Sequence, residues 1–261
     1  MIHIRNKYNL LNLFCILSLN IFFLIPFNLI GKQNHEMLEK ANKALDQKDF
    51  TTALQMYKMI EQQGYGGESM FRNMAYAAIS TNADADAILY LEKALKFNPN
   101  DSKLKQHLDQ IRSKNNLDDQ TADQPAIISF AKKVTGFFTL QLIIFVQFGI
   151  FCLIGLLSYR NFQFDKIKQN TKWQIGGLVF LLLMTFFIGS YRHSVIYEND
   201  GIIITKENTT IYLSPDTLSP QVAKLPVGTK ISYKDHISGW WQIETIYGES
   251  GWISTSNGSR I

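Results

Sequence analysis

The chain has 261 residues, with 26 Lys and Arg against 22 Asp and Glu, so its formal net charge is +4. Residues 32–124 hold twelve basic and fourteen acidic side chains, and residues 198–261 hold five and seven. The positive surplus therefore lies beside the apolar segments, which excludes a basic nucleic-acid surface and indicates membrane topology. Two cysteines inside apolar runs and five scattered histidines give no disulfide framework and no metal-ligand spacing.

Residues 1–31 begin with the basic stretch HIRNKYN and continue as an apolar run that breaks around Pro26 and Gly31. This order is typical of a secretory signal peptide. No small-x-small cleavage site precedes Lys32, so an uncleaved N-terminal anchor is the alternative. Both interpretations carry the chain from residue 32 onward across a membrane.

An internal repeat organises residues 34–116. Apolar residues match between two copies at an interval of 34 residues: Met37 with Phe71, Ala41 with Ala75, Ala44 with Ala78, Ala53 with Ala87, Tyr57 with Leu91, and Ile60 with Ala94. This interval is the period of the tetratricopeptide repeat (TPR), in which small residues let two antiparallel helices approach closely. A third helix, capped by Asp101 or Ser102, is expected to end the array. The sequence thus predicts an all-α TPR solenoid of two repeats plus a capping helix.

TPR arrays usually bind a peptide in a groove lined by the first helix of each repeat. The family positions that face this groove fall on Asn42, Arg72, Asn73 and Tyr76. Arg72 and Tyr76 are one helical turn apart, and an Arg beside an Asn suits a carboxylate or an acidic peptide. The alternative is that these are ordinary solvated polar residues on a short scaffold.

Residues 117–133 begin polar and acidic and are predicted to be a linker. Two apolar runs come next, at 134–159 and 173–191, and neither contains Asp, Glu, Lys or Arg. At about 1.5 Å per residue, each run is long enough to cross a hydrocarbon core of about 30 Å as a helix. The sequence therefore predicts two transmembrane helices.

The loop at 160–172 between these helices is basic. It holds Arg160, Lys166, Lys168 and Lys172 against Asp165 alone. Short loops rich in Lys and Arg stay on the cytoplasmic side of a membrane. This topology places the repeat and the C-terminal region together on the far side, where they are expected to be joined only through the membrane.

Residues 195–261 change to short runs rich in Ile, Thr, Tyr and Trp, separated by turns such as SPDTLSP, PVGT and YGES. This pattern predicts a small antiparallel β-barrel. Three features stand out, namely Leu213-Ser214-Pro215, the LPVGT turn, and the two Gly-Trp steps at Trp240 and Trp252. Through them, the region from about Thr205 to Ser256 resembles a bacterial SH3 domain.

Aromatic residues make this region a candidate ligand surface for a peptide or a glycan strand. The candidates are Tyr212, Trp240, Trp241 and Tyr247. Because neighbouring residues of a strand point to opposite faces, one of Trp240 and Trp241 is expected to be core and the other exposed. Trp252 is expected to pack in the core.

The predicted fold class is a multidomain membrane protein with a TPR solenoid, a two-helix transmembrane hairpin and an all-β SH3-like barrel. This combination resembles the TPR proteins of the Bacteroides aerotolerance operon, the BatE type. The resemblance implies a bacterial inner-membrane protein with two to three spans and periplasmic soluble domains. It also implies partners, namely von Willebrand factor A-type membrane proteins and a MoxR-type ATPase, and a role in envelope stress or oxygen tolerance.

Catalytic motifs are missing from the sequence: it has no G-x-S-x-G, no Walker A, no H-E-x-x-H, and no thiol outside the apolar segments. The sequence therefore predicts a non-enzymatic protein that requires no cofactor. Two hypotheses remain, a membrane scaffold for partner proteins and an envelope sensor that binds peptidoglycan. The short inner loop, which has no folded domain to receive a signal, favours the scaffold.

Overall fold

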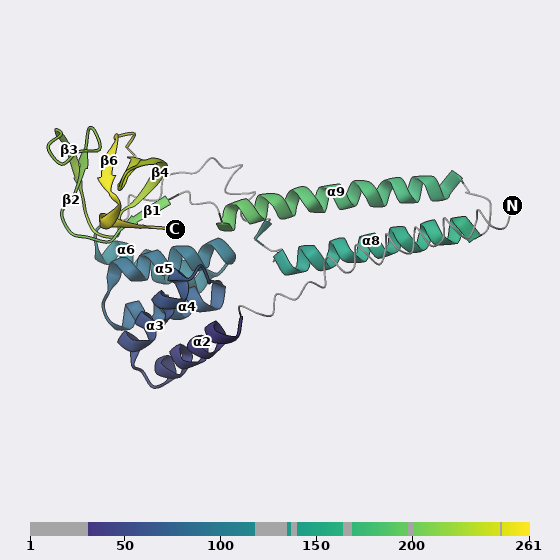
Figure 1. Cartoon of the computed structure of the whole chain (residues 1–261), viewed down its shortest axis with the longest axis horizontal. Helices are drawn as coiled ribbons and strands as arrows, with labels where there is room; N and C mark the ends of the chain where they lie inside the picture. The colour runs from purple at the N-terminus through teal and green to yellow at the C-terminus, as the bar shows by residue number, and fades with distance from the viewer. Residues whose placement is uncertain (1–30, 118–134, 137–139, 164–168, 198–200, 246) are drawn as a thin grey trace.

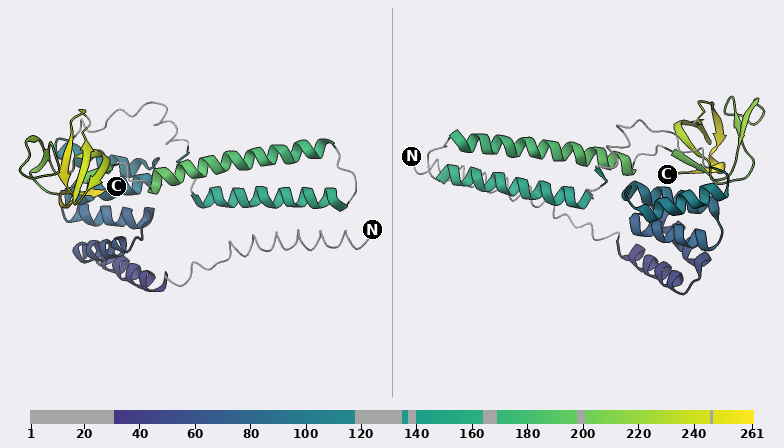
Figure 2. Two further views of the ribbon diagram at one scale, coloured as in Figure 1. Left: turned by 45° about the horizontal axis from the view of Figure 1, so that its top comes forward. Right: turned by 180° about the vertical axis from the view of Figure 1, so that it is seen from behind.

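The computed structural model describes residues 31–117, 135–136, 140–163, 169–197, 201–245 and 247–261. The predicted signal or anchor segment, apart from Gly31, and the linker beyond Leu117 lie outside these residues. The described chain forms a helical module (31–117), a long hairpin of two helices, and a β domain (201–261). Figure 1 shows the helical module and the β domain at the same end of the hairpin, and Figure 2 shows the same arrangement from two other directions.

The helical module consists of helices packed against their neighbours in chain order. They are α2 (Gly31–Asp46), α3 (Phe50–Gln62), α4 (Glu68–Ser80), α5 (Asp84–Phe97) and α6 (Ser102–Lys114). Asp49 caps α3 by accepting the N–H of Thr52 at 3.2 Å. Asp101 caps α6 by accepting the N–H groups of Lys103 and Leu104 at 2.9 and 3.1 Å, as one of the two predicted caps.

The backbone of the helical module repeats every 34 residues. Lys48, Asn82 and Asn116 all adopt a left-handed φ of 55–61°, at successive intervals of 34. After each of them, an N–H donates at 2.9 Å to the carbonyl five residues before it: Asp49 to Ala44, Ala83 to Ala78, and Leu117 to Arg112. This is a recurrent way to end a helix. Helix α6 thus ends as α2 and α4 do, like the first helix of a third unit.

Small residues lie where the helices of this module approach one another. Ala41, Ala53, Ala75 and Ala87 are at most 1% exposed. The large residues of the sequence repeat fill the remaining space, since Tyr57 and Leu91 are equally buried. The repeat in the sequence therefore coincides with the packing core of the module.

The hairpin consists of α8 (Leu140–Gln163) and α9 (Gln169–Tyr197). Both are long and apolar enough to cross a membrane, over Leu140–Ser158 and Lys172–Tyr197. Their apolar side chains are largely exposed, as at Phe145 (73%) and Phe187 (69%), so neither is the core helix of a globular module.

The second helix of the hairpin is longer than the second apolar run. The predicted span ends at Tyr191, whereas α9 continues without a break to Tyr197. Residues 195–197, which the sequence pattern assigns to the β domain, are therefore helical. This extension brings the end of α9 to the helical module.

The β domain is an antiparallel sheet in which the strands are ordered β3-β2-β6-β5-β4-β1-β7. The strands are β1 (Gly201–Ile204), β2 (Thr209–Tyr212), β3 (Gln221–Leu225), β4 (Lys230–Ile237), β5 (Trp240–Glu244), β6 (Ser250–Ser254) and β7 (Gly258–Arg260). Its core is mostly isoleucine, with Ile211, Ile243 and Ile253 fully buried. The prediction of a small antiparallel β domain is confirmed.

The β domain docks directly on the helical module. The strand β1 is buried on both faces: Ile202 and Ile204 enter the β core, whereas Ile203 joins the core of the helical module. Ile261 joins that same cluster. The expectation that the two modules are joined only through the membrane is therefore wrong, because an unbroken isoleucine run serves two cores.

Candidate functional site

Two of the predicted groove residues form a polar cluster with a buried tyrosine. The hydroxyl of Tyr57 donates to Oδ1 of Asn42 at 2.6 Å, and Nδ2 of Asn73 lies 3.2 Å from that hydroxyl and 3.3 Å from Oδ1 of Asn42. Burial raises the pKa of Tyr57, although the hydrogen bond from Asn73 opposes this shift. The cluster links α2, α3 and α4, so both asparagines have a part in holding the helices together.

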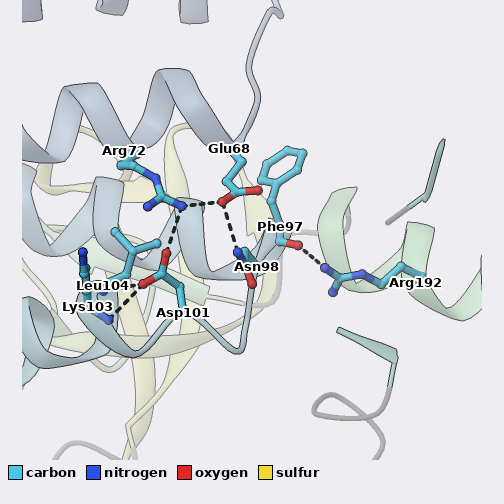
Figure 3. Close-up of polar contacts among 8 residues, drawn as sticks. All are labelled: Glu68, Arg72, Phe97, Asn98, Asp101, Lys103, Leu104 and Arg192. Carbon is cyan, nitrogen blue, oxygen red and sulfur yellow. Dashed lines mark hydrogen bonds and ion pairs between the residues drawn. The ribbon is translucent and has the colours of Figure 1, made fainter. Parts of the chain in front are cut away.

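Arg72, the predicted anion-binding residue, is engaged by two carboxylates (Figure 3). Its Nη2 lies 2.5 Å from Oε1 of Glu68 and 2.9 Å from Oδ2 of Asp101. Burial alone would lower the pKa of Arg72, but the hydrogen bonds and charges of Glu68 and Asp101 outweigh it and raise that pKa. Arg72 thus ties α4 to the cap of α6.

Tyr76 is the most open of the four predicted groove residues. Its side chain is 56% exposed and lies edge-to-face on Phe50, with ring centroids 5.6 Å apart. Exposed aromatic rings anchored on one side can supply contact area to a peptide at small entropic cost. Of the groove candidates, Tyr76 is the one best placed to touch a ligand.

The two adjacent tryptophans of β5 point to opposite faces, as predicted. Trp241 packs against the core of the β domain and lies 5.6 Å from the guanidinium of Arg260. Trp240 instead lies edge-to-face with Tyr212, at 5.6 Å between ring centroids. Trp240 and Tyr212 therefore form an outward aromatic pair.

Trp252 belongs to the same outward surface. It stands directly opposite Tyr212 on β2 and Gln242 on β5, while its neighbours Gly251 and Ile253 are buried. The expectation of core packing for Trp252 is wrong, because strict alternation along β6 gives the core face to Ile253. Sequence reasoning missed this residue, and the alternation was the signal that could have found it. We call Tyr212, Trp240 and Trp252 the aromatic face.

Tyr247, the remaining predicted ligand residue, lies in the turn between β5 and β6 and is 74% exposed. Among the described residues, no ring contact joins it to the aromatic face. The structure thus brings two of the four predicted residues together and adds Trp252 to them.

Residues 207–259 match the bacterial SH3 domain family. The match extends from the turn before β2 to β7, so it includes the whole aromatic face. It agrees with the resemblance seen in the sequence, and the β domain is therefore an SH3-like domain. A comparison with curated protein sequences finds no match for the chain.

A glycine turn of the SH3-like domain rests on the helical module. Gly228 has φ +85°, and a Cβ added to it would lie 2.7 Å from Cδ1 of Ile88 and 2.9 Å from Cδ1 of Leu117. Its N–H donates to the carbonyl of Ile204 at 2.8 Å. Glycine is required here both by the left-handed backbone and by the close approach of α5.

A buried carboxylate reinforces this junction. Glu92 on α5 is 9% exposed; its Oε1 lies 2.5 Å from Nη2 of Arg112 on α6, and its Oε2 lies 2.8 Å from Nζ of Lys230 on β4. Burial would raise the pKa of Glu92, but the two cations outweigh it and lower that pKa. The ionised carboxylate therefore joins three elements from two modules.

A second junction attaches the hairpin to the helical module. Arg192 near the end of α9 is 1% exposed and donates from Nη2 to the carbonyl of Phe97, the last residue of α5 (Figure 3). The ring of Tyr197 lies edge-to-face on that of Phe97, with centroids 6.4 Å apart. A cation at a helix C-terminus interacts favourably with the free carbonyls there. The helical module thus holds both the SH3-like domain and α9.

Proposed function

We propose that the protein is a non-enzymatic scaffold in a bacterial inner membrane, which presents two interaction modules to partner proteins on the periplasmic side. The observation that carries this proposal is the double junction on α5. The Gly228 turn and Glu92 attach the SH3-like domain, and Arg192 attaches α9. Two binding surfaces are thereby held at fixed positions at one end of an apolar hairpin, as a scaffold requires.

The helical module is proposed to be a TPR-type array. The support is the 34-residue interval of its left-handed turns at Lys48, Asn82 and Asn116, together with the buried alanines at matched positions. In such an array, Tyr76 would contact a partner peptide. Arg72 would contact an acidic group of that peptide only with a guanidinium that is also bonded to Glu68 and Asp101.

The membrane orientation is inferred from the basic loop at 160–172. Both soluble modules lie at the same end of the hairpin in Figure 1, which is why they are proposed to share one side of the membrane. In a cysteine-free background, cysteines replacing Ser69 and Leu218 should react with an impermeant maleimide in intact spheroplasts. A cysteine replacing Asn161 should react only after lysis. The reverse pattern would invert the orientation.

The specific partners are proposed on the family resemblance alone: von Willebrand factor A-type membrane proteins and a MoxR-type ATPase in an aerotolerance or envelope-stress complex. A photo-crosslinking residue placed at Tyr76 or at Trp252 in the full chain tests partner binding in native membranes. Met59, which is 51% exposed on α3, is the control position. We expect other membrane proteins to be captured from Tyr76 or Trp252 and not from Met59. Capture of a second copy of the chain alone would contradict the scaffold.

Peptidoglycan is the second candidate ligand, and the aromatic face favours it. Flat tryptophan rings such as Trp240 and Trp252 offer apolar contact to sugar rings together with an indole N–H donor. The full chain in detergent should sediment with purified sacculi, and Trp252→Ala should lower the retained fraction several-fold. Tyr247→Ala, at an exposed position outside the aromatic face, is the control. Absence of retention by the unmodified chain removes this candidate and leaves the scaffold untouched.

A further inference from the structure

Arg192, near the end of α9, is a buried cation with unused hydrogen-bond donors. Its side chain is 1% exposed, and its Nη2 donates to the carbonyl of Phe97. Its Nε and Nη1 are buried and have no hydrogen-bond partner. Among the described residues, no carboxylate forms an ion pair with this guanidinium. A buried cation without a counter-charge weakens the junction that it forms.

The carboxylate of Glu68, at the start of α4, is held close to this cation but is bonded to a different arginine. Its charge acts on Arg192. Its Oε1 accepts hydrogen bonds from Nη2 of Arg72 at 2.5 Å and from Nδ2 of Asn98 at 3.2 Å. Asn98 directly follows Phe97, so Figure 3 shows Glu68 between Arg72 and the end of α5 that Arg192 contacts.

The side chain of Glu68 is free to turn. It is 35% exposed, and its Oε2 forms no hydrogen bond with any described residue. Rotation between staggered side-chain conformations moves a glutamate carboxylate without moving its helix, and partly exposed side chains rotate rapidly. Exchange of Glu68 from one arginine to the other therefore requires no movement of α4.

The two arginines differ in their supply of negative charge. Nη2 of Arg72 also lies 2.9 Å from Oδ2 of Asp101, so Arg72 keeps a counter-charge when Glu68 leaves it. Arg192 gains its first carboxylate from the described residues if Glu68 arrives. A further carboxylate at Arg72, such as that of an acidic peptide in the groove, would repel Glu68 and favour its departure.

We propose that Glu68 is a shared carboxylate that couples the groove to the hairpin. When an acidic peptide contacts Arg72, Glu68 turns to Arg192 and supplies the counter-charge that this buried guanidinium lacks. Because the new pair forms only in the occupied state, the peptide strengthens the attachment of α9, and firmer attachment raises the affinity for the peptide by the same factor. The inference rests on the groove contact proposed above for Arg72.

The exchange of Glu68 can be tested without a ligand, because Arg72→Gln releases this carboxylate. Hydrogen exchange at residues 191–197, the last residues of α9, is followed by mass spectrometry of the full chain in detergent. In the Arg72→Gln background, we expect Glu68→Gln to speed this exchange about ten-fold, which corresponds to about 1.4 kcal/mol. In the unmodified background, Glu68→Gln should leave it nearly unchanged.

A matched background shows that the effect belongs to Arg72. Lys58→Gln removes a cation from another ion pair of the helical module, with Asp86 at 2.7 Å. In this background, Glu68→Gln should again have almost no effect on α9. Arg72→Met, which keeps the apolar stem of the side chain, repeats the comparison independently. General loosening by a background substitution cancels, because each ratio is taken within one background.

An equal effect of Glu68→Gln in the unmodified, Arg72→Gln and Arg72→Met backgrounds overturns the proposal. This failure is distinct from a failure of the groove, which is read by crosslinking at Tyr76. Capture of a partner at Tyr76 without the background dependence would leave the scaffold in place and remove the coupling. Background dependence without any capture would retain Glu68 as the shared carboxylate and contradict the groove as the site that controls it.

Discussion

The SH3-like domain has two surfaces of opposite character. One is docked on the helical module and combines a glycine turn, an isoleucine and an ion pair, at Gly228, Ile203 and Lys230. The other is the aromatic face, where Tyr212, Trp240 and Trp252 are all only partly buried. The docked surface holds the domain on the helical module through closely packed contacts. The rings of the aromatic face remain partly exposed. The docked contacts and the aromatic face are thus separate surfaces of the same small domain.

The helical module shows the converse arrangement. Its candidate groove residues Asn42, Arg72 and Asn73 are bonded within the module, so a groove ligand would have to share side chains that hold the helices together. Only Tyr76 is open. The comparison indicates that the SH3-like domain is better prepared for ligand binding, and that changes in the groove will disturb the module itself.

Removal of the buried carboxylate should have the largest effect on the docked surface. Glu92→Gln leaves Arg112 buried without its counter-charge, and we expect a loss of about 3–5 kcal/mol in unfolding free energy. Chemical denaturation of the full chain in detergent measures it. Glu36→Gln, in the exposed pair with Lys40, is the control and should leave stability unchanged. Replacement of Glu92 and Arg112 together by Met should restore most of the loss, and a loss as large in this double variant would contradict the ionic explanation.

Two glycines with the same φ of +85°, Gly228 and Gly239, allow the cost of a left-handed backbone to be measured separately from the cost of close contact with another element. Gly239→Ala meets nothing within 4 Å and should cost about 1–2 kcal/mol from the left-handed backbone alone. Gly228→Ala adds overlap with Ile88 and Leu117 and should cost about 1–3 kcal/mol more. Thermal unfolding followed by near-ultraviolet circular dichroism compares the two variants. Equal shifts would mean that the SH3-like domain does not rest on α5 in solution.

Acid should weaken the docked surface before it affects the open one. The folded-state pKa of Glu92 is lowered, so its ionised form contributes stability above the pKa of the unfolded chain, about 4.3, and that contribution is lost as the pH falls through the folded value. The difference in stability between the unmodified chain and Glu92→Gln should stay constant from about pH 7 to 5. It should shrink only below about pH 4.3, and a difference that shrinks already near pH 6 would contradict this assignment.

The smallest effect on stability is expected on the open surface. Trp252→Ala removes an outward side chain from a sheet and should cost about 1 kcal/mol. Ile253→Ala, at the next position of the same strand, opens a cavity in the core and should cost about 2–5 kcal/mol. The pair is compared by denaturation with urea. Equal costs would place Trp252 in the core after all.

Much of the architecture could be read from local pattern. The 34-residue repeat could be predicted from the matched residues between Met37 and Ala94 alone. These residues are local because each copy of the repeat supplies its own part of the core of the helical module. The apolar helices were predictable from length and charge, and the β domain was predictable from its turns and its match at 207–259. These features are local, so a window of a few tens of residues contains them.

The junctions could not be read in this way. Glu92 and Lys230 are 138 residues apart, and neither lies in a motif that names its partner. In the sequence, Gly228 is only a turn residue of the SH3-like pattern. In the structure, the space that a side chain would fill there is taken by Ile88 of α5. Arg192 directly follows the second apolar run in the sequence, where a basic residue is expected, although the structure buries it against the carbonyl of Phe97. Each of these residues satisfies a local rule and a distant contact at once, and only the local rule is visible in sequence.

The third left-handed turn, at Asn116, places Leu117 under the Gly228 turn. The end of the helical module next to the SH3-like domain is therefore fixed by this contact. An added unit after α6 would occupy the space that this domain fills, and a unit removed before α5 would shorten only the free end at α2. Relatives with this architecture should accordingly vary in length at the α2 end and keep the end next to the SH3-like domain fixed, so that growth of the array is one-sided.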